Sequence, residues 1–338
     1  MPVLDKPLSE LERYLGINPC PADIDEFWDK ALEEMNSVDP QIELIPAKFS
    51  APDVECFDLW FTGTKGARIY AKYMRPKNSP GKHPTILQFH GYTGNSGDWT
   101  THLAYAASGF CIAAMDCRGQ GGKSQDTGGH LGNTLDGHIV RGIENDDPNM
   151  LMFRDVFLDT AMLARVVSTF PEVDGEKLAA KGGSQGGALT LACASLVPQV
   201  KVAAPQYPFL CDYKRVWEMD LDLDAYRDMR QYFRRFDPRH ENEDRFFELL
   251  GYIDLKNIAH RIKGKVIMFT GLLDNICPPS TQFAAYNRIV SEKVHKIYPD
   301  YAHETLPQAE DITYDWIVYI GNSVSNVCTR RNLYYTFI

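Results

Sequence analysis

The sequence predicts an α/β protein whose mostly parallel, eight-stranded sheet is covered by helices on both faces. Six short apolar runs between residues 85 and 298 alternate with segments of helical periodicity, an order typical of a parallel sheet. Two β-type runs precede them, and the turn signal Gly63-Thr64-Lys65-Gly66 between these two runs predicts a hairpin. The 338 residues can bury one large core and contain no long Pro/Gly linker, so we expect a single domain over residues 1–338.

Residues 1–50 predict a helical extension that precedes the sheet. Apolar side chains recur there three or four positions apart, which places them on one face of a helix. They are Leu8, Leu11, Tyr14 and Leu15 in a first segment and Ile24, Phe27, Trp28, Ala31 and Leu32 in a second.

Short apolar runs predict the strands of the sheet, and apolar residues at helical spacing predict the helices between them. The predicted strands are 57–62, 68–74, 85–89, 110–115, 178–181, 200–204, 265–270 and 295–298. The helical patterns between and after them include 150–168, 185–196, 280–290 and 310–320.

One segment, residues 212–260, interrupts this alternation with dense charge and aromatic residues and shows no strand pattern. Because it lies between two core strands, we interpret it as a helical insertion over the carboxyl edge of the sheet, near the active site. The alternative is a solvated helical hairpin without a functional part. Residues 321–338 form a C-terminal tail whose role the sequence leaves open.

The charge balance argues against nucleic acid and membrane partners. Asp and Glu total 45 against 35 Lys and Arg, a net charge of −10, and an acidic surface repels phosphate backbones and anionic lipid. The sequence has no apolar run of the ~18 residues that a membrane helix needs. Its eight cysteines are scattered without a C-x-x-C pair, which favours free thiols in a reducing compartment. We therefore expect a cytoplasmic protein.

The strongest chemical signal is Gly182-Gly183-Ser184-Gln185-Gly186, a G-x-S-x-G motif between a short apolar run and a helical pattern. A serine on so tight a strand-to-helix turn has a strained backbone, and its neighbours two residues away must lack side chains. Gly182 and Gly186 meet that requirement. The motif predicts Ser184 as an exposed nucleophile, although a glycine-rich packing turn is the alternative.

A serine nucleophile needs a histidine base and an acid, which follow it in the chain order Ser, Asp or Glu, His. His303 lies in a short loop directly after the last predicted strand, whereas His240, His260 and His295 lie in the insertion or in a strand. Asp274 comes just after the strand 265–270, a position that the alternatives Asp254 and Asp300 do not share. We therefore predict Ser184, Asp274 and His303 as the catalytic residues.

The developing oxyanion needs two backbone N–H donors. Gln185 follows the nucleophile at a helix N-terminus, and Tyr92 lies in Phe89-His90-Gly91-Tyr92, the loop after the third strand. We predict both as the oxyanion hole and expect His90 to brace that loop by hydrogen bonding. Arg118 is interpreted as a structural tie, and no spacing in the sequence indicates a metal site.

Three motifs in order resemble one family: Arg118-Gly119-Gln120, the segment 182–186 and His303-Glu304. The chain resembles the acetyl xylan esterase/cephalosporin C deacetylase family, carbohydrate esterase family 7, which has the α/β-hydrolase fold. The resemblance covers nearly the whole chain. It implies the nucleophile, acid and base at Ser184, Asp274 and His303, with oxyanion donors at Tyr92 and Gln185.

The resemblance also implies an activity and an assembly. The activity is removal of acetyl groups from short xylo-oligosaccharides and cephalosporin C without a cofactor. The assembly is a homohexamer, a dimer of trimers, for which exposed aromatic side chains in the first helices and the hairpin would supply contacts. The ending of the tail, residues 330–338, is not associated with the family.

Bulky side chains in two loops are predicted to bind the substrate and to limit the acyl group to acetyl: Tyr92, Trp99, Tyr207 and Phe209. The alternative enzymes are a prolyl-oligopeptidase-like peptidase and a general short-chain carboxylesterase. A hydrolase fold without activity, used for binding, is the remaining alternative. The peptidases usually carry a propeller domain, and the sequence has no such repeat.

Overall fold

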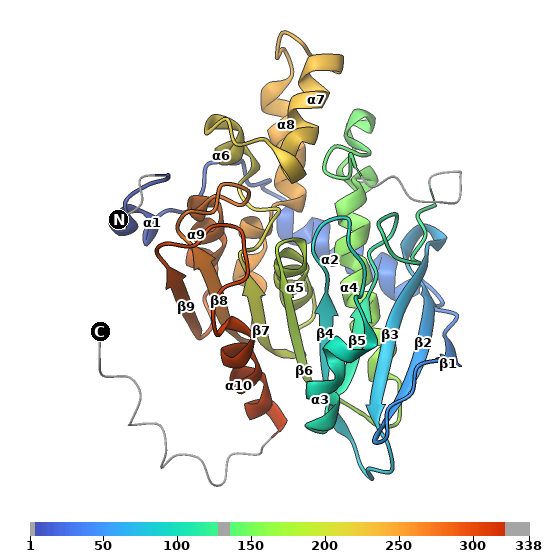
Figure 1. The fold of residues 1–338 in the computed structure, drawn as a ribbon. Helices are drawn as coiled ribbons and strands as arrows, with labels where there is room; N and C mark the ends of the chain where they lie inside the picture. Colours follow the sequence, from blue (N-terminus) through green and yellow to red (C-terminus); the bar gives the residue numbers. More distant parts are fainter. Residues whose placement is uncertain (1–3, 128–135, 322–338) are drawn as a thin grey trace.

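The computed structural model describes residues 4–127 and 136–321 (Figure 1). Within them one sheet has the order β1-β2-β3-β5-β4-β6-β7-β8-β9. The pairs β1–β2, β2–β3 and β3–β5 are antiparallel. All the remaining pairs, from β5–β4 across to β8–β9, are parallel, which confirms the predicted fold class. The strands are β1 (Glu43–Pro46), β2 (Val54–Thr62), β3 (Arg68–Pro76), β4 (His83–Phe89), β5 (Cys111–Met115), β6 (Val173–Gly183), β7 (Val200–Gln206), β8 (Lys265–Gly271) and β9 (Lys293–Tyr298).

The described sheet has nine strands, one more than the eight predicted. The additional strand is β1, which lies inside the segment 1–50 that we expected to be helical, and pairs with β2 at the edge of the sheet. Its residues are mostly exposed, so backbone pairing rather than an apolar face holds it in place. An element of this kind leaves no hydrophobic pattern in the sequence.

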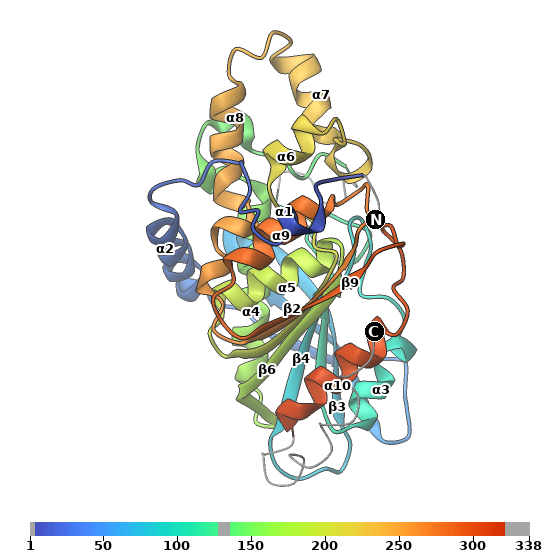
Figure 2. The same cartoon turned by 90° about the vertical axis from the view of Figure 1, so that its left-hand side faces the viewer.

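Helices cover both faces of the sheet. In the side view, α2, α4 and α5 lie on one side and α3 and α10 on the other (Figure 2). The helices are α1 (Leu8–Leu11), α2 (Ile24–Ser37), α3 (Leu103–Ala107), α4 (Met152–Ser168), α5 (Gln185–Leu196), α6 (Tyr213–Glu218), α7 (Arg227–Phe236), α8 (Glu243–Leu250), α9 (Pro279–Arg288) and α10 (Ala309–Gly321).

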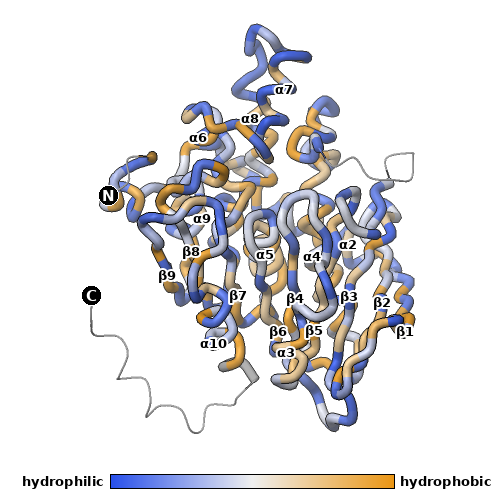
Figure 3. Tube along the Cα trace, in the orientation of Figure 1, coloured by the Kyte–Doolittle hydropathy of each residue, from blue (hydrophilic) through white to orange (hydrophobic). Residues whose placement is uncertain are grey.

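The burial of each helix follows from its residues. Helix α2 buries one stripe at the predicted spacing, and Trp28 on that stripe is fully buried. Helix α5 is buried on all sides, and its glycines allow close contact: a Cβ atom on Gly187 would lie 2.5 Å from the backbone oxygen of Gln206. Apolar residues accordingly follow the central strands, whereas the tip of the α7–α8 projection is mainly hydrophilic (Figure 3).

The segment 212–260 is helical, as predicted, and contains α6, α7 and α8. These helices project beyond the carboxyl edge of the sheet (Figure 1). The predicted helix 185–196 coincides with α5, and the other predicted helices start or end within two residues of α4, α9 and α10. Of the predicted tail 321–338, all but Gly321 lies outside the described residues. None of the described helices is long and apolar enough to cross a membrane.

Candidate active site

Ser184 lies on a strained turn between β6 and α5. Its φ of 57° and ψ of −119° fall where side chains are rarely found. The backbone N–H of Ser184 donates to the Gln206 oxygen (3.0 Å), and its carbonyl accepts from the Phe209 N–H (3.1 Å). Bonds to β7 and to the loop that follows it therefore hold the turn in this conformation.

The glycines two residues from Ser184 are required by close backbone contact. A Cβ atom on Gly182 would lie 2.6 Å from the backbone of Gly186 and from the Phe89 oxygen. A Cβ atom on Gly186 would lie 2.2 Å from the Phe89 oxygen. A side chain at either position would therefore collide with backbone atoms, which is the reason for which the motif has glycine there.

The structure brings Ser184, His303 and Asp274 into one hydrogen-bonded series at the carboxyl edge of the sheet. His303 Nε2 lies 3.0 Å from Ser184 Oγ, and His303 Nδ1 lies 2.8 Å from Asp274 Oδ2. An ionised carboxylate only accepts, so Nδ1 carries the proton and Nε2 accepts from the serine hydroxyl. This tautomer leaves the imidazole able to take the proton of Ser184.

The loops of Asp274 and His303 are packed against each other. Gly271 ends β8, and a Cβ atom there would lie 2.4 Å from the Tyr301 oxygen. The Leu273 N–H donates to the same oxygen (2.9 Å). Asp274 is fully buried, and its Oδ1 accepts from the N–H groups of Ile276 (3.0 Å) and Cys277 (2.8 Å). The acid therefore lies in a fixed position beneath the base.

The backbone N–H groups of Gln185 and Tyr92, predicted to form the oxyanion hole, are candidate donors in the structure. Gln185 is the first residue of α5, so its N–H has no acceptor within the helix. In the loop after β4, the Thr93 N–H is occupied by Gln120 Oε1 (2.9 Å) and the Gly94 N–H by the Gly91 oxygen (3.0 Å). The N–H of Tyr92 is therefore the candidate second donor.

His90 braces this loop as expected. Its Nδ1 lies 2.7 Å from the Gly91 oxygen, and its Nε2 lies 2.9 Å from the Cys117 nitrogen. The Cys117 N–H can only donate, so Nε2 accepts and Nδ1–H donates to the carbonyl. Burial lowers the pKa of His90, which favours this neutral form.

The tie predicted for Arg118 is present. Its buried guanidinium makes two hydrogen bonds to the buried carboxylate of Asp159 (2.6 and 2.7 Å). It also lies within hydrogen-bond distance of the Thr64 backbone oxygen (3.4 Å). Arg118 therefore joins α4 to the turn between β2 and β3, and its part is structural.

The comparison with known families decides the identity of this fold and site. The model of the acetyl xylan esterase (AXE1) family matches residues 1–319, nearly the whole chain. The chain belongs to the acetyl xylan esterase family. The resemblance expected from the three sequence motifs is thereby confirmed.

Two solved structures and one further relative agree with this match. The chain is similar to acetyl xylan esterase 1 from Thermoanaerobacterium sp. JW/SL YS485 (54% identity, TM-score 0.91), and the likeness covers 94% of this chain and 100% of that one. The acetyl xylan esterase from Paenibacillus sp. R4 is 35% identical with a TM-score of 0.87, covering 92% and 99%. Acetyl esterase Axe7A from Xylanibacter ruminicola is 26% identical over 307 residues, which are 88% of this chain and 66% of that protein.

Three of the four residues predicted to bind substrate lie near the triad of this family member or support its loops. The Tyr207 ring lies 4.8 Å from the His303 ring, and a Cβ atom on Gly183 would lie 3.2 Å from the Tyr207 ring. The Phe209 ring is fully buried and lies 5.6 Å from the Tyr92 ring. Phe209 therefore packs against Tyr92 inside the protein. Its predicted contact with the substrate is corrected, because a fully buried ring has no surface for a substrate.

Trp99 is not brought to this group of side chains. Its ring stacks on Phe49 at 6.0 Å, and the Lys72 ammonium lies 5.3 Å from the ring centre. These contacts belong to the hydrophobic cluster on the face covered by α3 and α10. The prediction that Trp99 lines the substrate pocket is therefore corrected. Its ring packs on Phe49 instead, because contact with an apolar side chain removes the indole surface from water.

Several polar residues around the site were missed by the sequence analysis. Gln120 and Gln282 bond to predicted site residues, and His138 Nδ1 lies 2.9 Å from the Tyr92 hydroxyl. Only Gln120 had a signal, its place in Arg118-Gly119-Gln120. The others lie in no motif.

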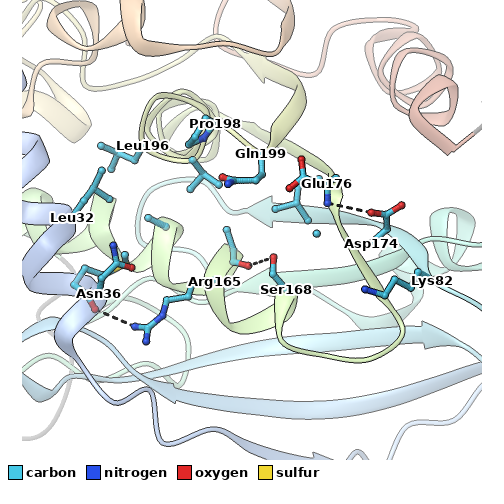
Figure 4. Close-up of a pocket in the computed structure, with 16 residues that line it drawn as sticks. Leu32, Asn36, Lys82, Arg165, Ser168, Asp174, Glu176, Leu196, Pro198 and Gln199 are labelled. Atoms are coloured by element: carbon cyan, nitrogen blue, oxygen red, sulfur yellow. Dashed lines mark hydrogen bonds between the residues drawn. The ribbon is translucent and has the colours of Figure 1, made fainter.

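A separate pocket of about 620 Å³ lies at the other end of the sheet, where Asn36, Arg165 and Asp174 are among its lining residues (Figure 4). None of the triad residues lines it. Arg165 is already bonded to the backbone oxygens of Met35 (3.3 Å) and Val38 (3.0 Å), so it joins α2 to α4. Among the described residues, no group of three His, Cys, Asp or Glu side chains could hold a metal ion.

Proposed function

We propose that this protein is a serine esterase that removes acetyl groups from short acetylated xylo-oligosaccharides through an acetyl-enzyme intermediate. The observation that carries the proposal is the series Ser184–His303–Asp274, with distances of 3.0 and 2.8 Å, on a strained turn. Membership of the acetyl xylan esterase family supports the substrate class.

In the first half of the reaction, Ser184 Oγ attacks the carbonyl carbon of the acetyl group. The hydroxyl proton passes to His303 Nε2, and the negative charge on the carbonyl oxygen is stabilised by the N–H groups of Gln185 and Tyr92. The tetrahedral intermediate collapses, its bond to the sugar oxygen breaks, and His303 gives the proton to that oxygen. Asp274 orients the imidazole and stabilises its positive charge.

In the second half, water attacks the carbonyl carbon of the acetyl-enzyme. His303 takes a proton from this water, and the same two N–H groups stabilise the oxyanion. The bond between the carbonyl carbon and Ser184 Oγ then breaks, the proton returns to Ser184, and acetate leaves. Every proton in this cycle moves through His303 Nε2, and no cofactor is part of the proposal.

The proposed preference for acetyl rests on rigid rings near the nucleophile. Tyr92 is held by its hydroxyl at His138 and by the ring of the buried Phe209, while Tyr207 lies against His303. Rings fixed in this way leave little room for a longer acyl chain. On the alcohol side we propose a permissive site that also accepts cephalosporin C, because a xylose ring and a cephem nucleus share little shape.

The proposed assembly is a homohexamer, a dimer of trimers. Apolar side chains that are exposed in one chain support it: Leu15, Ile17, Ile42 and Ile45. The aromatic contacts expected from the first helices are corrected, because Phe27 and Trp28 are buried within the chain. Light scattering should report six times the mass of one chain, and a monomer at micromolar concentration would contradict this assembly.

A cytoplasmic location is also part of the proposal. All seven cysteines of the described residues are free thiols, and six of them are buried. Free thiols are typical of a reducing compartment.

Acetate release from acetylated xylo-oligosaccharides, measured beside a peptide substrate, tests the proposed activity. We expect acetate release and no peptide cleavage. Faster peptide cleavage would favour the peptidase alternative, and equal rates on acetate and longer esters would favour a general carboxylesterase.

A further inference from the structure

A glutamine that the proposed mechanism does not use is bonded to the catalytic acid. Gln282 lies in the first turns of α9 and is fully buried. Its Nε2 donates to Asp274 Oδ2 (3.1 Å) and to the Cys277 oxygen (2.6 Å). Its Oε1 accepts from the Thr270 hydroxyl (2.7 Å). Both the nitrogen and the oxygen of this side-chain amide therefore have hydrogen-bond partners.

The hydrogen bonds beyond Gln282 have one direction. His295 Nε2 lies 2.8 Å from Thr270 Oγ1. Because the Thr270 hydroxyl gives its proton to Gln282, it accepts from His295, so His295 carries its proton on Nε2. Protons are thus donated in order from His295 to Thr270, from Thr270 to Gln282 and from Gln282 to Asp274.

His295 is fixed in this neutral form by its surroundings. Its ring packs against Phe283 (4.4 Å between ring centres) and Tyr286 (4.2 Å), and its Nδ1 has no hydrogen-bond partner in the described part of the chain. Burial and the positive charge of Lys293 lower the pKa of His295 to about 3. The imidazole therefore acts as a donor of constant protonation at neutral pH.

We propose that Gln282 is a positioning residue for the acid: it holds Asp274 Oδ2 toward His303 Nδ1, with Thr270 and His295 fixing the orientation of its amide. The inference rests on the proposed function of the triad. With Gln282 present, Asp274 accepts four hydrogen bonds, two on each oxygen. A carboxylate bonded in this way cannot rotate away from the imidazole.

Contacts from the N-terminal segment hold α9, which carries Gln282. The buried carboxylate of Asp5 accepts from the Ser280 N–H (2.7 Å) and pairs with Arg215 (2.8 Å). The first turn of α9 is therefore capped by a residue more than 270 positions away in the chain. Around Asp274 and Gln282 the ionisable groups among the described residues include His303, Cys277 and Tyr207, with His295 beyond Thr270.

The test compares Gln282→Leu, Gln282→Glu and Thr270→Val in the full-length protein, with Thr281→Val as the matched control. Thr281 is buried on the same helix, and its hydroxyl donates to the Pro278 oxygen (2.7 Å), away from Asp274 and Gln282 in the hydrogen bonds of the described residues. The measurements are kcat and KM for 4-nitrophenyl acetate as a function of pH, and the low-field proton NMR signal of the His303 Nδ1–H.

We expect Gln282→Leu to lower kcat about ten- to hundredfold with KM unchanged, because a hydrogen bond to a charged group is lost. Its His303 Nδ1–H signal should shift. Thr270→Val should give a smaller loss in the same direction, and Thr281→Val should match the wild type. Gln282→Glu keeps the shape but adds a carboxyl beside Asp274, so the acidic limb of the pH profile should move to higher pH.

Wild-type kcat, pH profile and NMR signal in a folded Gln282→Leu protein would overturn the inference. If that variant does not fold, an unchanged pH profile in Gln282→Glu together with wild-type kcat in Thr270→Val would overturn it. Ser184→Ala, measured in parallel, separates the two proposals. An active Ser184→Ala would remove the proposed function itself, whereas an inactive one beside a wild-type Gln282→Leu would remove this inference alone.

Discussion

Gln120 and Gln185 join their side-chain amides by two hydrogen bonds, from Gln120 Nε2 to Gln185 Oε1 (2.7 Å) and from Gln185 Nε2 to Gln120 Oε1 (3.0 Å). Gln120 Oε1 also accepts from the Thr93 N–H (2.9 Å). One buried amide thus connects the two chain segments whose N–H groups form the proposed oxyanion hole. These bonds therefore join the loop after β4 to the start of α5, the two segments of the proposed oxyanion hole.

Replacing Gln120 by leucine should therefore lower kcat more than it changes KM. The variant leaves Gln185 Oε1 and the Thr93 N–H without their partner, so both donor segments can move. Loss of one oxyanion donor costs about 10²- to 10³-fold in kcat, and we expect a loss up to the lower figure. Steady-state kinetics with 4-nitrophenyl acetate checks it. Gln88→Leu, which removes a similar contact to His102 (3.2 Å), is the control and should keep wild-type kcat.

Ser184→Ala should fold normally and lose nearly all acetate release. Asp274→Asn should lose about 10⁴-fold in kcat, because an amide in that place favours the wrong tautomer of His303. Acetate release and circular dichroism of both variants provide the measurement. Near-normal turnover in Ser184→Ala would show that another nucleophile acts.

A serine-directed organophosphonate should label one residue, Ser184, and abolish activity. The prediction follows from the hydroxyl of Ser184 being the one bonded to His303 Nε2 (3.0 Å). Mass spectrometry of the labelled protein identifies the site. A chelator should leave activity unchanged, and activity lost in EDTA and restored by a metal would place the enzyme in a metal-dependent class.

The rate on 4-nitrophenyl esters should fall steeply as the acyl chain lengthens from two to eight carbons. Each methylene forced against the fixed rings of Tyr92 and Tyr207 costs about 1–3 kcal/mol, or roughly ten- to two-hundredfold in kcat/KM. The butyrate should be far slower than the acetate, and the octanoate hardly cleaved. A kcat/KM that stays level or rises along the series would contradict acetyl selectivity.

Stability should fall as the pH drops below about 6.5, the ordinary pKa of histidine. Burial lowers the pKa of His138 to about 4 and that of His295 to about 3. Between these values and 6.5 the unfolded chain binds protons that the folded chain does not, so the free energy of unfolding decreases as pH falls. Each group contributes a slope of about 1.4 kcal/mol per pH unit.

Urea unfolding at a series of pH values measures this slope. His295→Gln keeps an N–H donor for Thr270 but does not titrate, so its slope should be smaller than that of the wild type by one such group. An unchanged slope in this variant would show that His295 does not stay neutral in the folded protein.

Much of this architecture is local and was predictable. The burial of Trp28 on one stripe of α2 and the coincidence of α5 with residues 185–196 follow from spacing alone. The turn at Ser184 requires residues without side chains at positions 182 and 186, and the sequence has glycine at both. The meeting of Ser184, Asp274 and His303 was predictable for a different reason: each residue follows a different strand of the parallel part of the sheet, and parallel strands end at one edge.

The sequence by itself determined most of the strands and helices and which three residues follow strands at the nucleophile, acid and base positions. Only the tertiary structure decided the partners of Gln282, Gln120 and His138, the place of Trp99 and the pairing of β1. The physical reason is the distance along the chain over which each effect acts. Hydrophobic periodicity and backbone sterics act between residues close in sequence and leave a pattern there. A buried amide instead bonds to a group that the packed loops bring within about 3 Å, whatever its position in the sequence. Gln120 and Gln185 are 65 residues apart, and no local pattern records that distance.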